Sequence, residues 1–269
     1  MSHLFDKSGA PDDDLKALEE RLASARAPAR DWERLAKPRR RPAPLIALAA
    51  ALVLGIVYVQ LTRKAWIETT EQTELKVAEI GKVTVEPHSR LRFIDPHHLE
   101  LARGGLHAKV NAPPRLFVVD TPAAQAVDLG CEYRLTVDAQ GTTRLEVLKG
   151  EVSLEGHGAA SRVSAGAVCL TKKGDAPGVP RSGHSQQAFT QALDAWESHA
   201  GGIQPVLATA QKDDAVSLWN MIPRVDEQER PEVIARLKGV IEEPPKDVVD
   251  SDVVQLKPPA MESLWQAFP

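Results

Sequence analysis

The sequence is poor in the residues on which nucleic-acid sites and structural metal sites depend. Aromatic residues make up 4% of its 269 residues, which excludes rows of rings on which bases could stack. The formal net charge of -4 is small for this length and indicates neither a nucleic-acid-binding protein nor an acidic tail. The two cysteines cannot supply a four-ligand zinc site alone, and no CxxC is present.

The signatures of the common enzyme classes are also missing. The sequence contains no GxSxG, GxxxxGK[ST], HExxH or GxGxxG, so the usual nucleophile, phosphate and zinc motifs are absent. We therefore expect a protein that is not an enzyme and that uses no cofactor or metal. An enzyme is the most distant of the alternatives.

Four histidines fall close together and deserve a test as metal ligands, because imidazole is the commonest metal-binding side chain. They are His88, His97, His98 and His107. The adjacent pair would point to opposite faces of a strand, and no acidic or cysteine ligand stands at a tight spacing beside them. Surface or turn histidines are the expected alternative.

One long uncharged run is present. Residues 43–61 read APLIALAAALVLGIVYVQL, about nineteen residues, which is near the length that crosses a bilayer. Basic residues flank the run, and Tyr58 and Trp66 lie where interfacial aromatics are common. The run predicts a transmembrane helix at 43–62, with a buried soluble helix as the alternative. A cleaved signal peptide fits poorly because about forty residues precede the run.

The flanking charges predict the direction of this span. Seven lysines and arginines lie between residues 26 and 41, whereas Arg63, Lys64 and Lys76 are the nearest after the run. This bias places residues 1–42 in the cytoplasm and the rest outside the inner (cytoplasmic) membrane. A small-xxx-small spacing within the run would support pairing of two spans in a homodimer, with lipid-facing small residues as the alternative. The residues of this spacing are Ala47, Ala51 and Gly55.

The segment before the span contains one predicted helix. PDDDLKALEERLASAR begins with proline and three aspartates, which suit the start of a helix. Leu15, Leu18 and Leu22 then fall on one face. The helix is either solvated or binds a cytoplasmic partner.

Residues 65–178 predict a mainly β domain. Short alternating strands are separated by glycine- and proline-containing turns, and Gly104-Gly105 separates HLELA from LHAKV in this scheme. Regular spacing of such strands predicts an antiparallel sandwich or barrel-like domain with one apolar face inward. The strand after Cys131 and the strand around Leu145 should form a hairpin about the loop at Gly141.

Residues 185–269 predict a small α-helical region, because the apolar period changes after the Pro/Gly-rich segment 175–183. Its short helices should pack on one another or on the sheet. The apolar stripes are Phe189, Leu193 and Trp196; Leu218, Trp219, Ile222 and Val225; Val233, Leu237 and Ile241; and Met261, Leu264, Trp265 and Phe268.

The two cysteines, Cys131 and Cys169, both lie in the part predicted to be outside the cytoplasm, where a disulfide persists. A bridge between neighbouring strands would stabilise the domain by about 3–4 kcal/mol. Two buried free thiols are the equal alternative.

Segments of the β region appear in an order that resembles the FecR domain of bacterial regulators of extracytoplasmic-function sigma factors. They are RLFVVDTPAAQAVDLGCEYRLTV, TRLEVLKGEVSLE and VSAGAVCL, preceded by ELARGGLHAKV. The DLGCEY form, followed by a helical region, resembles a subgroup of this family. The matching positions are Phe117, Val119, Thr121, Pro122, Asp128, Leu129, Gly130, Leu145, Val147, Gly150, Val152, Ala165 and Gly166.

The resemblance implies a single-pass inner-membrane protein that passes an envelope signal to a sigma factor in the cytoplasm, as an anti-sigma factor or sigma regulator. It implies a sigma factor as the partner of the N-terminal segment and an envelope protein as the partner of the outer domain. An envelope structural or binding module without a sigma-factor partner is the alternative.

Overall fold

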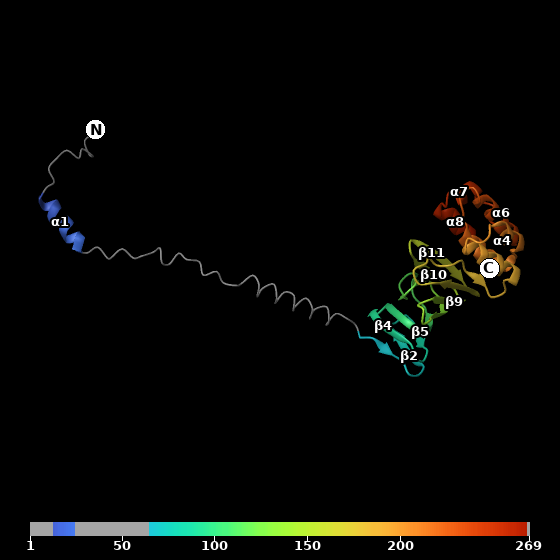
Figure 1. Cartoon of the computed structure of the whole chain (residues 1–269), viewed down its shortest axis with the longest axis horizontal. Coiled ribbons are helices and arrows are strands. Elements are labelled where there is room, and N and C mark those ends of the chain that lie inside the picture. Colours follow the sequence, from blue (N-terminus) through green and yellow to red (C-terminus); the bar gives the residue numbers. More distant parts are fainter. Residues whose placement is uncertain (1–12, 25–64, 268–269) are drawn as a thin grey trace, which may run out of the picture. The chain divides into compact units, whose positions relative to one another are not determined.

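The structure, a computed structural model, describes residues 13–24 and 65–267, and the chain divides into two units, 1–62 and 63–269. In the first unit, helix α1 spans Asp13–Ser24 (Figure 1). The helix predicted there from the leucine stripe is thus present.

The predicted transmembrane helix at 43–62 lies outside the described residues, and so do Ala47, Ala51 and Gly55. In residues 13–24 and 65–267 no helix has both the length and the apolar character needed to cross a bilayer.

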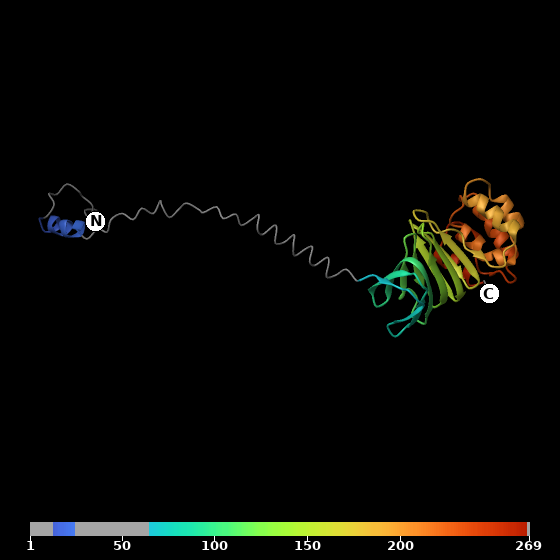
Figure 2. The ribbon, with the colours of Figure 1, turned by 60° about the horizontal axis from the view of Figure 1, so that its bottom comes forward.

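The second unit is mainly β, with a curled sheet like half a barrel followed by helices (Figures 1 and 2). Every strand pair is antiparallel except β5 with β6. Alternate side chains along most strands are buried, as the sequence pattern predicts. The strands are β1 (Ile67–Glu68), β2 (Thr73–Val77), β3 (Gly81–Val85), β4 (Arg90–Asp95), β5 (His98–Val110), β6 (Val118–Asp120), β7 (Gln125–Asp128), β8 (Glu132–Val137), β9 (Thr143–Lys149), β10 (Glu151–Gly156), β11 (Ala159–Ser164), β12 (Ala167–Thr171) and β13 (Arg181–Ser182).

Strand β5 is one long strand, so the predicted turn at Gly104-Gly105 is wrong. Its first half pairs with β4 and β6, and its second half pairs with β3 and β8. Gly104 has φ +89, and a Cβ there would lie 2.5 Å from Ser89 Cα. The buried Ser89 hydroxyl accepts a hydrogen bond from Gly105 N at 3.0 Å. The two glycines therefore bend the strand without ending it, because the ladder continues on both sides.

The predicted hairpin is confirmed. Strands β8 and β9 pair with Leu135 opposite Leu145, and both side chains are fully buried. The connecting loop is closed by the Asp138 carboxylate, which accepts hydrogen bonds from Gln140 N and Thr142 N at 2.9 and 2.8 Å. Gly141 has a positive φ of 81, as a tight hairpin loop requires.

The four predicted apolar stripes fall on four helices or at their ends, apart from Phe268, which lies outside the described residues. The sequence pattern did not predict two short helices and a 3-10 turn. The predicted helices are α3 (Gln187–Glu197), α5 (Ala215–Met221), α6 (Arg230–Val240) and α8 (Pro258–Trp265); the others are α4 (Gln204–Thr209), η2 (Lys212–Asp214) and α7 (Asp250–Val254).

Two hydrophobic cores stabilise this unit, one inside the curled sheet and one among the helices. Val216 of α5 and Trp265 of α8 belong to the sheet's core, and Val179 of the sheet's last loop belongs to the helical core. The side chain of Trp219 packs against both cores. The helices are therefore attached to the sheet by apolar contacts from both sides.

Candidate functional site

The first family-motif segment forms a closed turn after β6. Phe117 is fully buried just before this strand. The Thr121 hydroxyl donates to Ala124 O at 2.6 Å and accepts from Ala124 N at 3.0 Å. The Thr143 hydroxyl of β9 donates to Thr121 Oγ1 at 2.7 Å. Thr121, which Pro122 follows in the β6–β7 turn, thus closes this turn and ties it to β9, a strand that pairs with β8 and β12.

The second motif segment places a carboxyl group inside the sheet. Asp128 lies opposite Val152, and only 1% of its surface is exposed. Its Oδ1 accepts hydrogen bonds from Gly130 N at 2.9 Å and from the Cys131 thiol. Its Oδ2 and the buried Tyr133 hydroxyl have no hydrogen-bond partner among the described residues. Burial raises the pKa of Asp128, the pKa of Cys131 and the pKa of Tyr133.

The motif glycines bring the turns together at one end of the domain. Gly130 and Gly150 have φ values of +99 and +76, and a Cβ on Gly150 would lie 2.3 Å from Gly130 O. Ala165 N donates to Gly150 O at 3.0 Å, and Gly166 N donates to Val147 O at 2.9 Å. Leu129 N donates to Glu151 O at 3.2 Å.

The structure therefore brings most family-motif positions together as turn and core residues. Val152 is fully buried, whereas Ala165 and Gly166 border one surface cavity and Leu129 borders another. As turn and core residues, these positions serve the fold of the domain.

Cys131 and Cys169 are both free and buried. Cys169 lies opposite Leu145, which lies opposite Leu135, four residues from Cys131. Two strand spacings and four residues along a strand separate the two cysteines by about 16 Å, whereas a disulfide needs Cα atoms within about 7 Å. Of the two alternatives, the structure has the pair of buried thiols.

Two of the four clustered histidines are paired with carboxylates of neighbouring strands. His98 Nε2 lies 2.7 Å from Asp120, and His107 Nε2 lies 2.9 Å from Glu132. Within the part of the chain that the structure describes, no three His, Cys, Asp or Glu side chains are grouped so as to hold a metal ion.

The edge strand β11 is joined to the helices by polar side chains. The Asn220 amide of α5 accepts a hydrogen bond from Arg162 N and donates one to Arg162 O, both at 2.9 Å. The Arg224 guanidinium donates to Ser161 Oγ at 2.5 Å and to Ala160 O at 3.2 Å. Burial lowers the pKa of Arg224. These two side chains occupy hydrogen-bonding groups that a further strand would otherwise use.

Aromatic rings complete this junction. The rings of Trp219 and Trp265 meet edge to face with centroids 4.8 Å apart, and the Arg162 guanidinium lies 4.4 Å from the Trp265 ring. Arg162 also pairs with Glu262 of α8 at 2.6 Å and with Glu151 at 2.7 Å. The helical region is thereby held on the β10–β11 edge by both charge and stacking.

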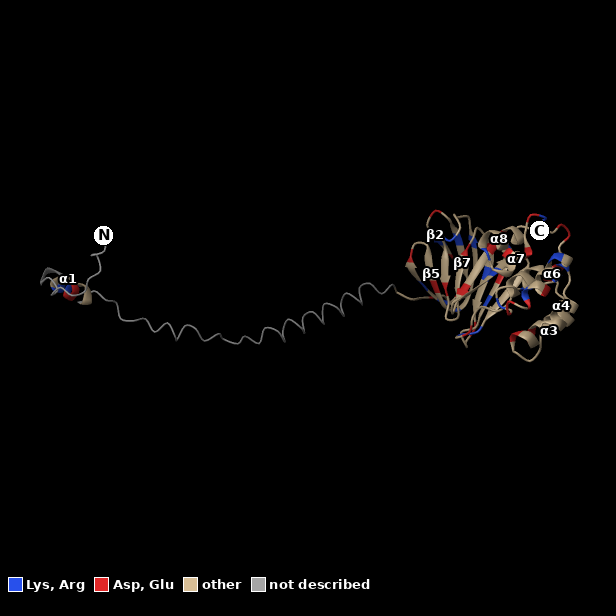
Figure 3. Ribbon diagram, turned by 90° about the horizontal axis from the view of Figure 1, so that it is seen from above, with Lys and Arg blue, Asp and Glu red and all other residues tan. Residues whose placement is uncertain are grey.

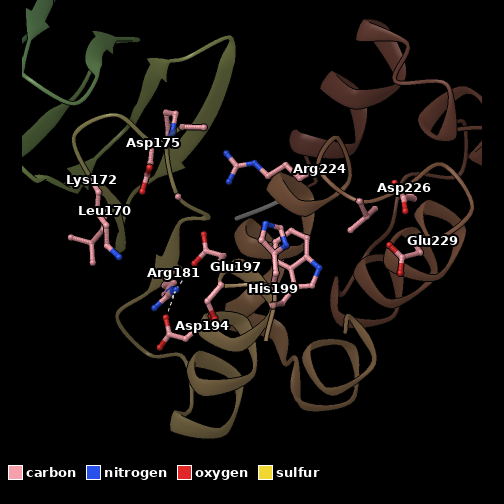
Figure 4. Close-up of a pocket in the computed structure, with 16 residues that line it drawn as sticks. Leu170, Lys172, Asp175, Arg181, Asp194, Glu197, His199, Arg224, Asp226 and Glu229 are labelled. Carbon is pink, nitrogen blue, oxygen red and sulfur yellow. Dashed lines mark hydrogen bonds and ion pairs between the residues drawn. The ribbon is translucent and has the colours of Figure 1, made fainter. Parts of the chain in front are cut away.

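Beside the junction lies an open cavity of about 860 Å³ between the end of β12, helix α3 and the loop after α5 (Figure 4). Arg181 bridges Asp194 and Glu197 at 2.6 and 2.5 Å on its floor. Glu197 also accepts a hydrogen bond from Val179 N at 2.6 Å. Arg224 enters the cavity from the opposite wall in Figure 4.

The lining of this cavity is mixed in character. Its ionisable side chains carry both signs, and apolar contact surface comes from Leu170, Pro177 and Trp196. Ser198, the lining hydroxyl, donates to backbone oxygens of α3 and not to His199. The charged lining residues are Lys172, Arg181 and Arg224, with Asp175, Asp194, Glu197, Asp226 and Glu229.

Sequence reasoning missed this junction because its residues come from segments far apart in the chain. Asn220 gave one usable signal, since it is a lone amide in the apolar stretch AVSLWNMI, and a buried amide needs hydrogen-bond partners. Arg181 and Glu197 gave none, because each looks like an ordinary surface charge in the sequence.

The comparisons with known proteins agree with the resemblance found in the sequence. Residues 63–153 match the family model described as FecR protein, which covers β1 to the start of β10. The resemblance to the FecR domain is confirmed over this range. No curated protein matches the chain significantly.

Two crystal structures of a protein described as a "putative anti-sigma factor" from Parabacteroides distasonis ATCC 8503 are similar to this chain at 14% identity and a TM-score of 0.39. They cover 49% and 50% of this chain. The chain spans 64% and 65% of their length, which is less than two thirds.

Proposed function

We propose that this chain is a single-pass regulator of the FecR type, which passes a signal from the cell envelope to an extracytoplasmic-function sigma factor in the cytoplasm. The observation that carries the proposal is the FecR match over residues 63–153, in which the motif residues take up turn and core positions. The subgroup defined by DLGCEY and a helical C-terminal region is part of the same proposal.

Membrane anchoring completes the proposal and rests on the sequence. The uncharged run at 43–61 is long enough for one span, and the arginine-rich side faces the cytoplasm. The β domain and the helical region would then lie outside the inner membrane, where the charged cavity beside α3 is available to an envelope partner. The protein acts by binding and is not an enzyme.

Helix α1 is the proposed binding element for the sigma factor. Leu18 and Leu22 are 53% and 58% exposed on one face of this short helix. An amphipathic helix with an unburied apolar stripe is suited to a groove on a partner protein.

Capture of partners by the full-length chain tests the cytoplasmic role. Leu18→Asp should abolish capture of a sigma factor, because it places a charge in the apolar stripe. Ala17→Asp adds the same charge to another exposed face of α1 and should leave capture unchanged. Capture of no sigma factor by the unaltered chain would favour an envelope module without such a partner.

Reporter fusions test the topology separately. Alkaline phosphatase, which is active only outside the cytoplasm, should be active when fused after residue 267 and inactive when fused before residue 43. Activity in the reverse pattern, or recovery of the chain in the soluble fraction, would overturn the anchored arrangement.

A further inference from the structure

Strand β2 forms an edge of the curled sheet that no described element covers. It pairs with β3 alone, from Thr73 opposite Val85 to Val77 opposite Gly81. It lies at the end of the domain away from α4 and α6 (Figures 1 and 3). The β11 edge, by contrast, is closed by Asn220 and Arg224. The chain thus covers the β11 edge and leaves the β2 edge open to pairing.

The charges on this open strand are unbalanced within the chain. Lys76 lies directly opposite Lys82, a like-charge pair that disfavours the sheet. Glu74 pairs with Lys82 at 2.8 Å, and no carboxylate of the described residues forms an ion pair with Lys76. An acidic group beyond the β2 edge would supply the missing partner.

We propose that β2 pairs antiparallel with β2 of a second copy of this chain, about a two-fold axis at Leu75. In that register Glu74 of each copy lies opposite Lys76 of the other, so both lysines gain a carboxylate. The interface is self-complementary, as a two-fold dimer requires. The curled sheets of the two copies then join into one sheet across the axis.

Charge selects this register among the symmetric ones. A two-fold antiparallel pair must centre on a single residue, because side chains that lie opposite each other share a face. An axis at Glu74 would place two glutamates together, and an axis at Lys76 would place two lysines together. Only the axis at Leu75 opposes unlike charges at both flanking positions.

The interface is small, which suits chains held in one membrane. A five-residue edge buries far less than the roughly 1,200 Å² of a stable soluble complex. Anchoring of both copies raises their effective concentration and compensates for the small area. The inference rests on the proposed membrane anchoring only for this increase in effective concentration.

Cysteine crosslinking of the full-length chain in membranes, and at high concentration in detergent, tests the pairing. Leu75→Cys places a thiol opposite the thiol at the same position of the second chain, so the variant should form a disulfide-linked dimer under mild oxidation. Position 73 lies on the same face of the strand, but in this register the two copies of position 73 are about 14 Å apart. Thr73→Cys should therefore crosslink about tenfold less. The native thiols give little background because both are buried.

Charge reversal supplies the matched control. Lys76→Glu should lower the crosslinked fraction of the Leu75→Cys chain about fivefold, because it places Glu opposite Glu in both halves of the interface. The same change relieves the Lys76–Lys82 repulsion inside each copy, so the loss cannot come from a weakened domain. Adding Glu74→Lys to Lys76→Glu restores opposite charges and should restore the dimer.

Equal crosslinking at positions 75 and 73, or no rescue by the double reversal, would overturn the pairing. These outcomes are independent of the sigma-factor proposal, since the disulfide reports only the proximity of two β2 strands. Loss of sigma-factor capture with intact crosslinking would overturn the proposed function and leave the dimer standing.

Discussion

The side-chain amide of Asn220 replaces a neighbouring strand for Arg162, because it hydrogen-bonds both the backbone N–H and the backbone C=O of that residue at 2.9 Å. A third hydrogen bond, to Val216 O at 2.8 Å, fixes the amide on α5. Every polar atom of this buried side chain thus has a partner. The sheet edge and the helical region are therefore stabilised by the same residue.

Removal of the Asn220 amide should destabilise the β11 edge of the sheet and the helical region together. Asn220→Ala leaves the partly buried N–H and C=O of Arg162 without protein partners, and we expect a loss of about 2 kcal/mol in the free energy of unfolding. Denaturant titration followed by circular dichroism measures it. Asn111→Ala, at an exposed position, should change stability little. An Asn220→Ala chain as stable as the unaltered one would refute the bridging role.

Replacement of the buried carboxyl should change the pH dependence of stability. The pKa of Asp128 is raised by burial, so its ionisation disfavours the folded state as the pH rises above 3.8 and through that raised pKa. Asp128→Asn should therefore gain stability relative to the unaltered chain at neutral pH, by about 1.4 kcal/mol for each unit by which the pKa is raised. The gain should vanish below the unperturbed value.

Asp138 provides the control of opposite sign. Backbone hydrogen bonds from Thr142 lower the pKa of this exposed carboxylate, so its contribution is present above the unperturbed pKa and lost as the pH falls through the lowered one. Asp138→Asn should cost stability at neutral pH and cost nothing in strong acid. Parallel pH profiles for the two variants would contradict the assignment.

Two glycines with the same φ allow the cost of a strained backbone to be measured apart from the cost of a steric clash. Gly150 and Gly158 both have φ +76, but only at Gly150 would a Cβ collide with Gly130 O, while nothing lies within 4 Å at Gly158. Gly158→Ala should cost about 1 kcal/mol from conformation alone, and Gly150→Ala roughly 3–4 kcal/mol. Melting temperatures of the two variants measure the difference, and equal temperatures would argue against the close approach.

The thiols of Cys131 and Cys169 should be unreactive in the folded protein. Burial raises the pKa of Cys169 to about 12 and raises the pKa of Cys131 further, so neither forms the reactive thiolate near neutral pH. Alkylation at pH 8 followed by mass spectrometry should add no label to the native chain and two labels in denaturant. No label after unfolding without reductant would indicate a disulfide between the two cysteines.

Local patterns predicted the β domain well because each strand alternates inward and outward residues. The hairpin of Leu135 and Leu145 followed from that alternation and from one glycine loop. Gly104-Gly105 misled because the same dipeptide that ends a strand can also bend one. The difference depends on a contact with Ser89, which lies outside the local pattern of the strand. Short helices α4 and α7 have too few turns to show a period.

The candidate site was less accessible from the sequence. The motif positions were found as a likeness, and their structural role became clear only when Gly130 and Gly150 were seen to touch. The cavity beside α3 depends on how the helices dock on the sheet. Arg181 and Glu197 meet there because of that docking, which no local period encodes.

Because β5 serves both halves of the curled sheet, tension would pass through this strand. A pull that enters at β1 reaches β5 through the β4 ladder, and β5 is also hydrogen-bonded to β3, β6 and β8. Shearing one half away would break several ladders of one strand at once. The domain should therefore resist mechanical unfolding and carry a force applied at β1 across the sheet before its strands separate.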